Sequence, residues 1–202
     1  MSGGGRVERV ETVRRRGHAH VREVILAEAW RLADEAGIAG LTLRELARRV
    51  GMQAPSLYTY FGSKDALFDA MFRAGYEALD RAQTDWAAAV EGMDTVDALA
   101  RSLEWWIDFC QESIARYQLM FTRAIPGWSP SPEAYAASSR QFERMNAALA
   151  AVGVEGEEQL ALFTALSAGL AAQQLANDPD GDSWKSLAPV AADMFVRYGR
   201  NR

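Results

Sequence analysis

The chain has 202 residues, of which 49% are hydrophobic and 24% are charged, and its formal net charge at pH 7 is −5. This composition is typical of a folded globular protein. Because no run of about 18 apolar residues occurs, we expect no membrane-spanning helix and no membrane partner. The single cysteine, Cys110, excludes an intrachain disulfide and a metal site built from several cysteines.

Charge is unevenly divided along the chain. Residues 1–64 contain 11 Lys or Arg and 7 Asp or Glu, whereas residues 65–202 contain 11 basic and 20 acidic residues. A basic segment neutralises the phosphates of a nucleic acid, and an acidic segment is repelled by them. The sequence therefore predicts that a nucleic acid binds at the N-terminal end.

The first segment, residues 1–19, combines three consecutive glycines with three consecutive arginines, and we expect a flexible basic arm. Two interpretations of this arm stay open: a solvated tail, or an arm that enters a minor groove. The segment lacks the apolar core of a secretion signal, so we expect a cytoplasmic protein. The only histidines, His18 and His20, lie at the edge of the first predicted helix without cysteines or a carboxylate set, so no metal site is expected.

Three helices are predicted within residues 20–63, over residues 20–36, 43–50 and 54–60, from apolar residues at helical spacing. Thr42 and Glu45 form the sequence pattern of a capping box at the start of the second helix. Gly51 is suited to the left-handed turn after it, and Pro55 to the first turn of the third helix. Two short helices joined by a tight glycine turn are typical of a DNA-binding helix-turn-helix.

The residues expected to contact DNA lie at the start of the second helix, along the third, and just after it. Gln53 is suited to bidentate pairing with adenine, whereas hydroxyls, helix N-termini and lysines are ordinary phosphate partners. The full set is Thr42, Arg44, Gln53, Ala54, Ser56, Tyr58, Thr59, Tyr60 and Lys64.

Residues 20–72 resemble the N-terminal domain of the TetR (tetracycline repressor) family of bacterial transcription regulators. The resemblance is carried by Ile25, Leu26, Ala29, Leu32, Gly37, Leu41, Thr42, Leu46, Ala47, Gly51, Leu57, Tyr58, Tyr60, Phe61 and Lys64. It implies a homodimer, a small-molecule effector, repression, and phosphate contacts by Thr42, Tyr58, Tyr60 and Lys64. Many members carry His where this chain has Tyr60. A phenol still donates to a phosphate, so this departure puts the base preference in question rather than the phosphate contact.

The remainder, residues 64–202, is predicted to be a helical bundle for ligand binding and dimerisation. Ser63 is suited to cap a long helix that starts at Lys64 and continues past Trp86. Later helices are expected over residues 94–110, 114–121, 131–153, 155–176 and from 186, with loops at 124–131 and 177–182. Starting the last helix at Ser186 puts Pro189 in its first turn. We therefore expect an all-α protein with about nine helices.

Large side chains gather in the middle of the chain and allow two interpretations. They form either a packed core or an apolar pocket for the effector, and aromatic residues at helical spacing are more often core. Trp128 is the strongest pocket candidate, as a lid, because it lies in a loop with two prolines and a glycine. The candidate ligand-binding residues are Trp105, Phe109, Tyr117, Phe121, Trp128, Phe142 and Met145.

The helix over residues 155–176 is apolar around much of its circumference and rich in small residues, so it must be buried on more than one face. It is either a central core helix of a monomer or part of a two-fold dimer interface with the last helix. The candidate interface residues are Ala165, Gly169, Ala172, Met194 and Tyr198.

The chain carries none of the common enzyme motifs, and no cofactor is expected. The sequence and the resemblance together predict a homodimeric regulator that binds a palindromic double-stranded DNA operator and responds to a small, largely apolar effector. The resemblance implies that it is a repressor, which the effector releases from DNA. The alternative is a helical small-molecule-binding or carrier protein that does not act through DNA. Salt-dependent binding to a specific palindromic duplex separates the two.

Overall fold

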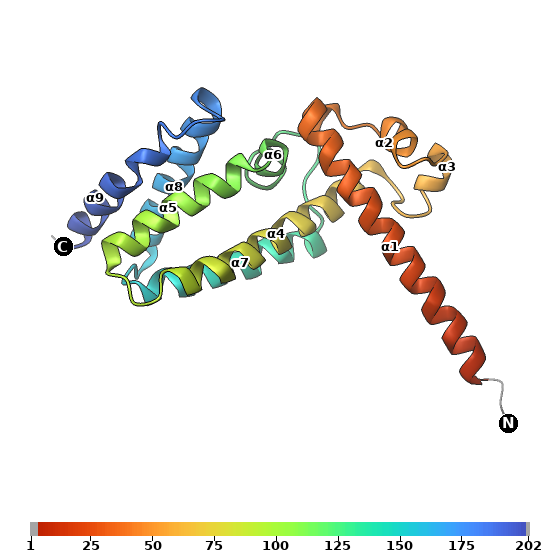
Figure 1. The fold of residues 1–202 in the computed structure, drawn as a ribbon, viewed down its shortest axis with the longest axis horizontal. Helices are drawn as coiled ribbons and strands as arrows, with labels where there is room; N and C mark the ends of the chain where they lie inside the picture. Colours follow the sequence, from red (N-terminus) through yellow and green to blue (C-terminus); the bar gives the residue numbers. More distant parts are fainter. Residues whose placement is uncertain (1–3, 201–202) are drawn as a thin grey trace.

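The computed structural model describes the backbone of residues 4–200 and the side chains of residues 16–199. Nine α-helices and two short 3-10 helices make up the regular structure of this described part, which contains no strand, and the expected all-α fold is confirmed. Figure 1 shows a small group of helices at the N-terminal end and a larger bundle at the other end. None of the described helices is long and apolar enough to cross a membrane.

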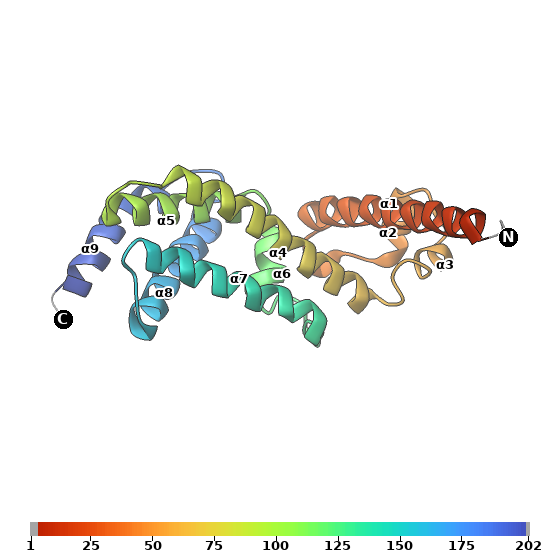
Figure 2. The ribbon, with the colours of Figure 1, turned by 90° about the horizontal axis from the view of Figure 1, so that it is seen from below.

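The N-terminal group consists of α1 (Gly4–Ala36), a 3-10 turn at Ile38–Gly40, α2 (Leu43–Arg49) and α3 (Ala54–Leu57). Residues 1–19 were expected to form a flexible arm, and the structure places residues 4–19 in α1, which begins at Gly4. The Arg, Glu and Val residues between Gly5 and Gly17 are compatible with a helix, and they continue directly into the part of α1 that packs in the N-terminal core. Figure 2 shows the start of α1 projecting past α2 and α3.

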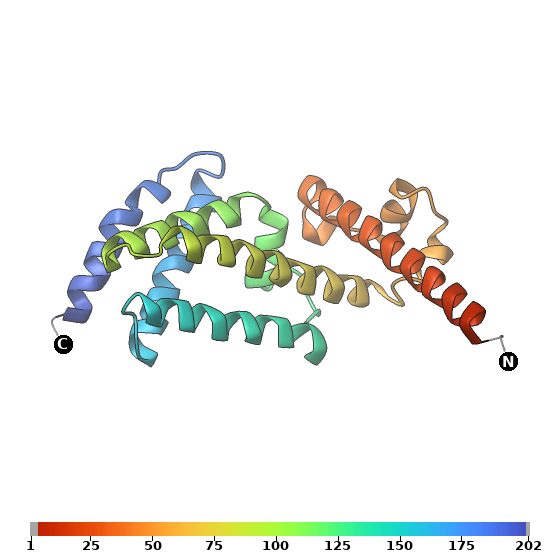
Figure 3. The same cartoon turned by 60° about the horizontal axis from the view of Figure 1, so that its bottom comes forward.

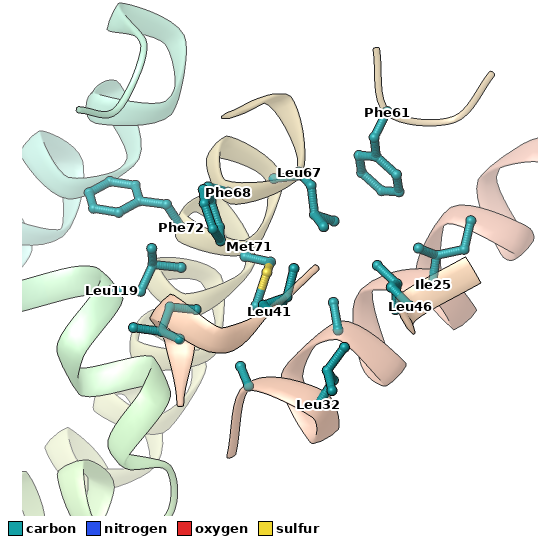
Figure 4. Packing of buried hydrophobic residues seen from close by; sticks show 14 of the residues in the cluster. Ile25, Leu32, Leu41, Leu46, Phe61, Leu67, Phe68, Met71, Phe72 and Leu119 are labelled. Atoms are coloured by element: carbon teal, nitrogen blue, oxygen red, sulfur yellow. The ribbon is translucent and has the colours of Figure 1, made fainter. Parts of the chain in front are cut away.

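One apolar cluster holds the N-terminal helices together and extends into the bundle. It combines Ile25 of α1 and Leu46 of α2 with Phe68 and Met71 of α4 (Lys64–Ala89), all of them almost completely buried. Leu119 of α6 (Ile114–Phe121) belongs to the same cluster, so the core crosses the predicted boundary at residue 64. Figure 4 shows these side chains converging from three sides.

The long helix α4 starts as predicted, since the Ser63 hydroxyl accepts a hydrogen bond from the Ala66 N–H at 3.0 Å. It runs parallel to α7 (Pro132–Ala151), which lies along it in Figure 3. Their contacts keep a nearly constant offset: the Ser131 N–H donates to Asp69 at 3.2 Å, Gln141 donates to Gln83, and Arg144 pairs with Asp80. Polar contacts at three levels therefore fix the register of the two helices.

The rest of the bundle is built around α5 (Thr95–Gln111), which packs against α8 (Glu157–Asn177) and α9 (Ala188–Arg200). A second apolar cluster joins these helices through residues such as Leu103, Phe163 and Phe195. A 3-10 turn at Lys185–Leu187 precedes α9, so Pro189 lies in the first turn of the helix as expected.

At Gly75, α4 lies against the side chain of Met120 in α6. A Cβ atom added there would lie 2.5 Å from Sδ of Met120. We therefore expect Gly75→Leu to lower the free energy of unfolding by about 1–3 kcal/mol through overpacking, less the gain from better helix propensity. Urea denaturation measures this, and Met120→Ala in the same chain should restore part of the loss. A single variant as stable as the parent would contradict the close approach.

Candidate nucleic-acid interface

The N-terminus of α2 is capped by Thr42, whose hydroxyl accepts a hydrogen bond from the Glu45 N–H at 3.3 Å. The predicted cap is confirmed, but the Glu45 carboxylate binds Arg48, at 2.6 and 2.8 Å, as well as Arg49. Hydrogen bonds from Arg48 are the main reason that the pKa of Glu45 falls to about 2. Arg49 also pairs with Glu35, and this ion pair joins α2 to α1.

The turn between α2 and α3 has the expected geometry. Gly51 adopts φ of 69°, a left-handed conformation that costs a glycine little, and the Met52 N–H donates to the Ala47 carbonyl at 2.8 Å. Gln53 then takes an extended conformation at the N-cap of α3, with Pro55 in the first turn. These bonds fix the direction in which α3 leaves α2.

The third helix is shorter than the predicted range of 54–60, because α3 ends at Leu57 and residues 58–60 form turns. At Thr59 and Tyr60 the N–H donates to the carbonyl three residues back, Ser56 at 3.2 Å and Leu57 at 2.9 Å, whereas the Phe61 N–H donates four residues back to Leu57 at 3.0 Å. The Thr59 hydroxyl also donates to the Ser56 carbonyl at 2.7 Å. Apolar spacing over a single turn does not distinguish these two patterns.

The predicted DNA contacts belong to α2 and α3 with their N-cap residues, the turns after α3 and the first residue of α4, in the N-terminal group of helices (Figure 1). Leu57 and Phe61 point into the core, as expected, and this leaves the intervening Tyr58 with 51% of its surface exposed. Half-buried members of the set are Ala54, Tyr60 and Lys64; the exposed members are Thr42, Arg44, Gln53, Ser56, Tyr58 and Thr59.

Lys64 is half-buried because its ammonium lies 5.1 Å from the centre of the Phe68 ring. This cation–π contact holds the charge beside the N-terminus of α4. The location is compatible with a phosphate contact, because a helix N-terminus attracts anions as well.

Two residues of α1 that the sequence analysis did not select also lie at this surface. The Arg22 guanidinium donates to the Tyr60 carbonyl and lies 4.3 Å from the centre of the Phe61 ring. Burial, followed by the charge of Arg73, lowers the pKa of Arg22. One turn earlier, the His18 ring stacks on Tyr60 with the ring centres 4.6 Å apart. In the sequence, only the spacing of four residues between His18 and Arg22 indicates that the two side chains share one face of α1.

Four of the candidate ligand-binding residues form one aromatic group through Trp106. Phe109 and Phe121 lie 6.2 and 5.0 Å from Trp106 between ring centres, while Trp105 contacts Phe109 at 6.1 Å and Tyr117 contacts Phe121 at 6.0 Å. The indole N–H of Trp106 donates to a carbonyl of α8, that of Ser167, at 3.2 Å. This group connects α5 and α6, and Trp106 ties it to α8.

The other three candidates lie elsewhere. Trp128 packs against Phe68 and Phe72, with ring centres 5.7 and 6.0 Å away, and its role as a pocket lid stays a prediction. Its loop folds back onto α4 and places the indole in the N-terminal core. Met145 packs in the second cluster, and Phe142 is exposed on α7.

A buried polar group between α4 and α7 had no signal in the sequence. Gln83 and Gln141 are hydrogen-bonded to each other, and both are more than nine-tenths buried. Neither the Gln141 Oε1 atom nor the indole nitrogen of Trp86, one turn from Gln83, has a protein hydrogen-bond partner. Buried polar atoms of this kind are normally satisfied by water or by a ligand.

The exposed face of α8 and α9 excludes one of the two interpretations of the small-residue helix. Ala165, Gly169 and Ala172 are exposed, and a Cβ atom added at Gly169 meets nothing within 4 Å. Met194 of α9 is 66% exposed. The helix is therefore not the centre of a monomer core. The fifth candidate, Tyr198, is also exposed and donates to Glu158 at 2.7 Å.

The described residues contain no group of three or more His, Cys, Asp or Glu suited to a metal ion.

Residues 25–71 match the family model described as bacterial regulatory proteins, tetR family. An HTH-type transcriptional regulator of Mycobacterium tuberculosis is 33% identical over 101 residues, or 48% of this chain and 42% of the relative. The tetracycline repressor protein class C of Escherichia coli is 37% identical over 76 residues, or 35% of each chain. The matches thus span less than half of these curated relatives.

The structural comparison extends the similarity to most of the chain. A TetR family transcriptional regulator from Thermus thermophilus, PfmR, superposes with a TM-score of 0.60 and 25% sequence identity. The superposition covers 86% of this chain and 97% of that one. The structural likeness therefore includes the helical bundle, whereas the matches to the curated relatives span less than half of this chain.

Gln53 stands exposed at the start of α3, the end of a recognition helix that normally meets base edges. We expect Gln53→Ala to weaken binding by about 1–3 kcal/mol and to relax the preference at one base pair of each half-site. Binding to a library randomised at each position measures both effects. Lys64→Ala is the matched control, because it should weaken binding to all duplexes alike and lower the salt slope by about one unit. An unchanged base preference in Gln53→Ala would exclude the pairing.

Proposed function

We propose that the chain, which belongs to the TetR family by its N-terminal domain, is a DNA-binding transcription regulator that acts as a homodimer and responds to a small-molecule effector. The observation that carries the proposal is the geometry after Gly51, which leaves Gln53, Ser56 and Tyr58 exposed beside the basic surface of α2. An exposed polar and aromatic helix end on a fixed turn is what reading a major groove requires.

The charge distribution supports a single orientation on double-stranded DNA. The first 64 residues have an excess of four basic residues, while the remaining residues have an excess of nine acidic residues. Phosphates attract the first and repel the second, so the protein approaches DNA with α2 and α3 foremost. Such a protein acts where the chromosome is, in the cytoplasm of a bacterial cell.

The homodimer is supported by the face that α8 and α9 leave exposed. Small side chains on α8 permit close approach of a second helix, and the large apolar side chains of Val190 and Met194 on α9 lie in solvent, 59% and 66% exposed. Two copies related by a two-fold axis would bury both helices. The same axis would place the two reading heads, each formed by α1, α2 and α3 of one chain, on the two halves of a palindrome.

The effector is proposed to bind in the bundle beside α4, where Trp86 and Gln141 offer a buried donor and acceptor among aromatic side chains. This arrangement suits an uncharged, largely apolar molecule with a few polar atoms. Because α4 begins in the core of the reading head, an effector that favours another position of α4 would change the affinity for DNA. The name of the class C relative, a repressor, supports repression as the sign.

The function is tested by selecting duplexes from a randomised pool with the unmodified protein. We expect a palindrome to be enriched and its affinity to fall steeply with salt, because several phosphates are neutralised on binding. Sedimentation of the complex should give two chains for each duplex. A protein that enriches no sequence at any salt concentration would support the carrier alternative instead.

The dimer face is tested by Gly169→Arg. At the two-fold axis the new side chain would appear twice at the same contact, so we expect a folded monomer that no longer binds the palindrome tightly. Light scattering gives the oligomeric state and circular dichroism the helix content. Because a side chain at Gly169 meets open space within one chain, the variant should fold. Gly62→Arg, at an equally open position away from α8, is the control for the oligomeric state. A variant that stays dimeric would place the interface elsewhere.

A further inference from the structure

The segment after α3 is held from outside by two residues of α1. The Arg22 guanidinium binds the Tyr60 carbonyl and covers the Phe61 ring, and the His18 imidazole stacks on the Tyr60 ring at 4.6 Å with 27° between the planes. Arg22 therefore fixes the backbone of Tyr60, and His18 fixes its side chain. Both contacts come from one face of α1, since the two residues are four apart.

This restraint acts where the helix-turn-helix is least regular. Residues 58–60 lie beyond the end of α3, and the Tyr60 N–H has only a bond three residues back, to Leu57. A tyrosine in such a turn has more than one side-chain rotamer available. The stack with His18 selects one of them before any DNA arrives.

We propose that His18 is a positioning residue for DNA binding, which holds the Tyr60 phenol in the orientation that donates to a backbone phosphate. The proposal rests on the proposed function. It adds a role for the part of α1 that precedes the N-terminal core. A side chain ordered in advance loses less conformational entropy when it binds, so the stack raises affinity without adding a contact to DNA.

The exposure of His18 argues against a mainly structural role. Its side chain lies in solvent and covers only the outer face of the half-buried Tyr60, whereas the core beneath is closed by Phe61, which is almost completely buried. Loss of the imidazole therefore leaves the packed core unchanged. The effect should appear in DNA binding and not in the unfolding temperature.

A direct contact between His18 and a phosphate is the competing explanation, and the two predict different salt dependence. A cationic imidazole that neutralises a phosphate releases a counterion, so its removal would lower the salt slope by about one unit. A residue that acts only through Tyr60 leaves the salt slope unchanged. The two explanations also differ for a ring without charge at the same position.

The experiment uses the full-length protein and the palindrome that the unmodified protein selects from a randomised pool. Three single variants are His18→Ala, His18→Phe and Tyr60→Ala. A double variant combines His18→Ala with Tyr60→Ala. His20→Ala is the matched control, because this histidine is also exposed on α1 but lies beside Glu23 at 3.8 Å. Affinity is measured over a series of salt concentrations, and thermal unfolding confirms that each variant is folded.

We expect His18→Ala to weaken binding about three- to tenfold, a loss typical of one aromatic contact, with an unchanged salt slope. His18→Phe should stay within about twofold of the unmodified protein because it keeps the stack. In the Tyr60→Ala background, His18→Ala should have no further effect. His20→Ala should bind like the unmodified protein.

Each other outcome overturns the proposal. Equal losses for His18→Phe and His18→Ala with a lower salt slope would identify a direct phosphate contact. An undiminished effect of His18→Ala in the Tyr60→Ala background would show that His18 acts elsewhere, and normal binding by His18→Ala would show that the stack is irrelevant. A protein that selects no duplex overturns the proposed function together with the proposal, whereas the other results overturn the positioning role alone.

Discussion

The first turns of α4 carry apolar side chains that are buried on two sides at once. Leu67 and Met71 belong to the same cluster as α1 and α2, and Phe68 and Phe72 contact Trp128 from the loop before α7. Burying one such side chain contributes roughly 1.5–3 kcal/mol, so four of them resist separation of the reading head from the bundle. The head therefore moves only if α4 moves with it. The proposed regulation would have to act through this joint, the apolar contacts of residues 67–72 with the head on one side and the bundle on the other.

The joint is continued by polar contacts that fix α4 to its neighbour α7. The Asp69 carboxylate accepts a hydrogen bond from the Ser131 N–H at the start of α7. Further along, Asp80 pairs with Arg144, and Gln83 is hydrogen-bonded to Gln141. The middle contact is exposed and contributes little, because surface ion pairs are screened by water and salt. The amide pair is different, since breaking it would leave buried polar groups without partners. A molecule that replaces this pair would act on α4 at a point remote from the DNA and linked to it through one rigid helix.

Local chemistry explains which parts of this arrangement the sequence predicts. Thr42, Gly51 and Ser63 are recognisable because caps and left-handed turns depend on one residue and its immediate neighbours. The length of α3, the inward position of Trp128 and the stack of His18 on Tyr60 depend on which helix lies opposite, and periodicity carries no such information. The exposed face of α8 is only partly predictable from the sequence. Its small residues predict burial on two sides, but they do not indicate whether the covering helix comes from the same chain or from a second chain.

A rigid joint between head and bundle has a direct consequence for the spacing of half-sites. The most direct measurement is the affinity of the proposed dimer for palindromes whose half-sites are moved apart by one base pair at a time, because each base pair shifts a half-site by about 3.4 Å and about a tenth of a turn. The account predicts one sharp optimum and, two base pairs away from it, affinity no better than that for a single half-site. Equal affinity over several spacings would contradict it, because the heads would then move independently of α4.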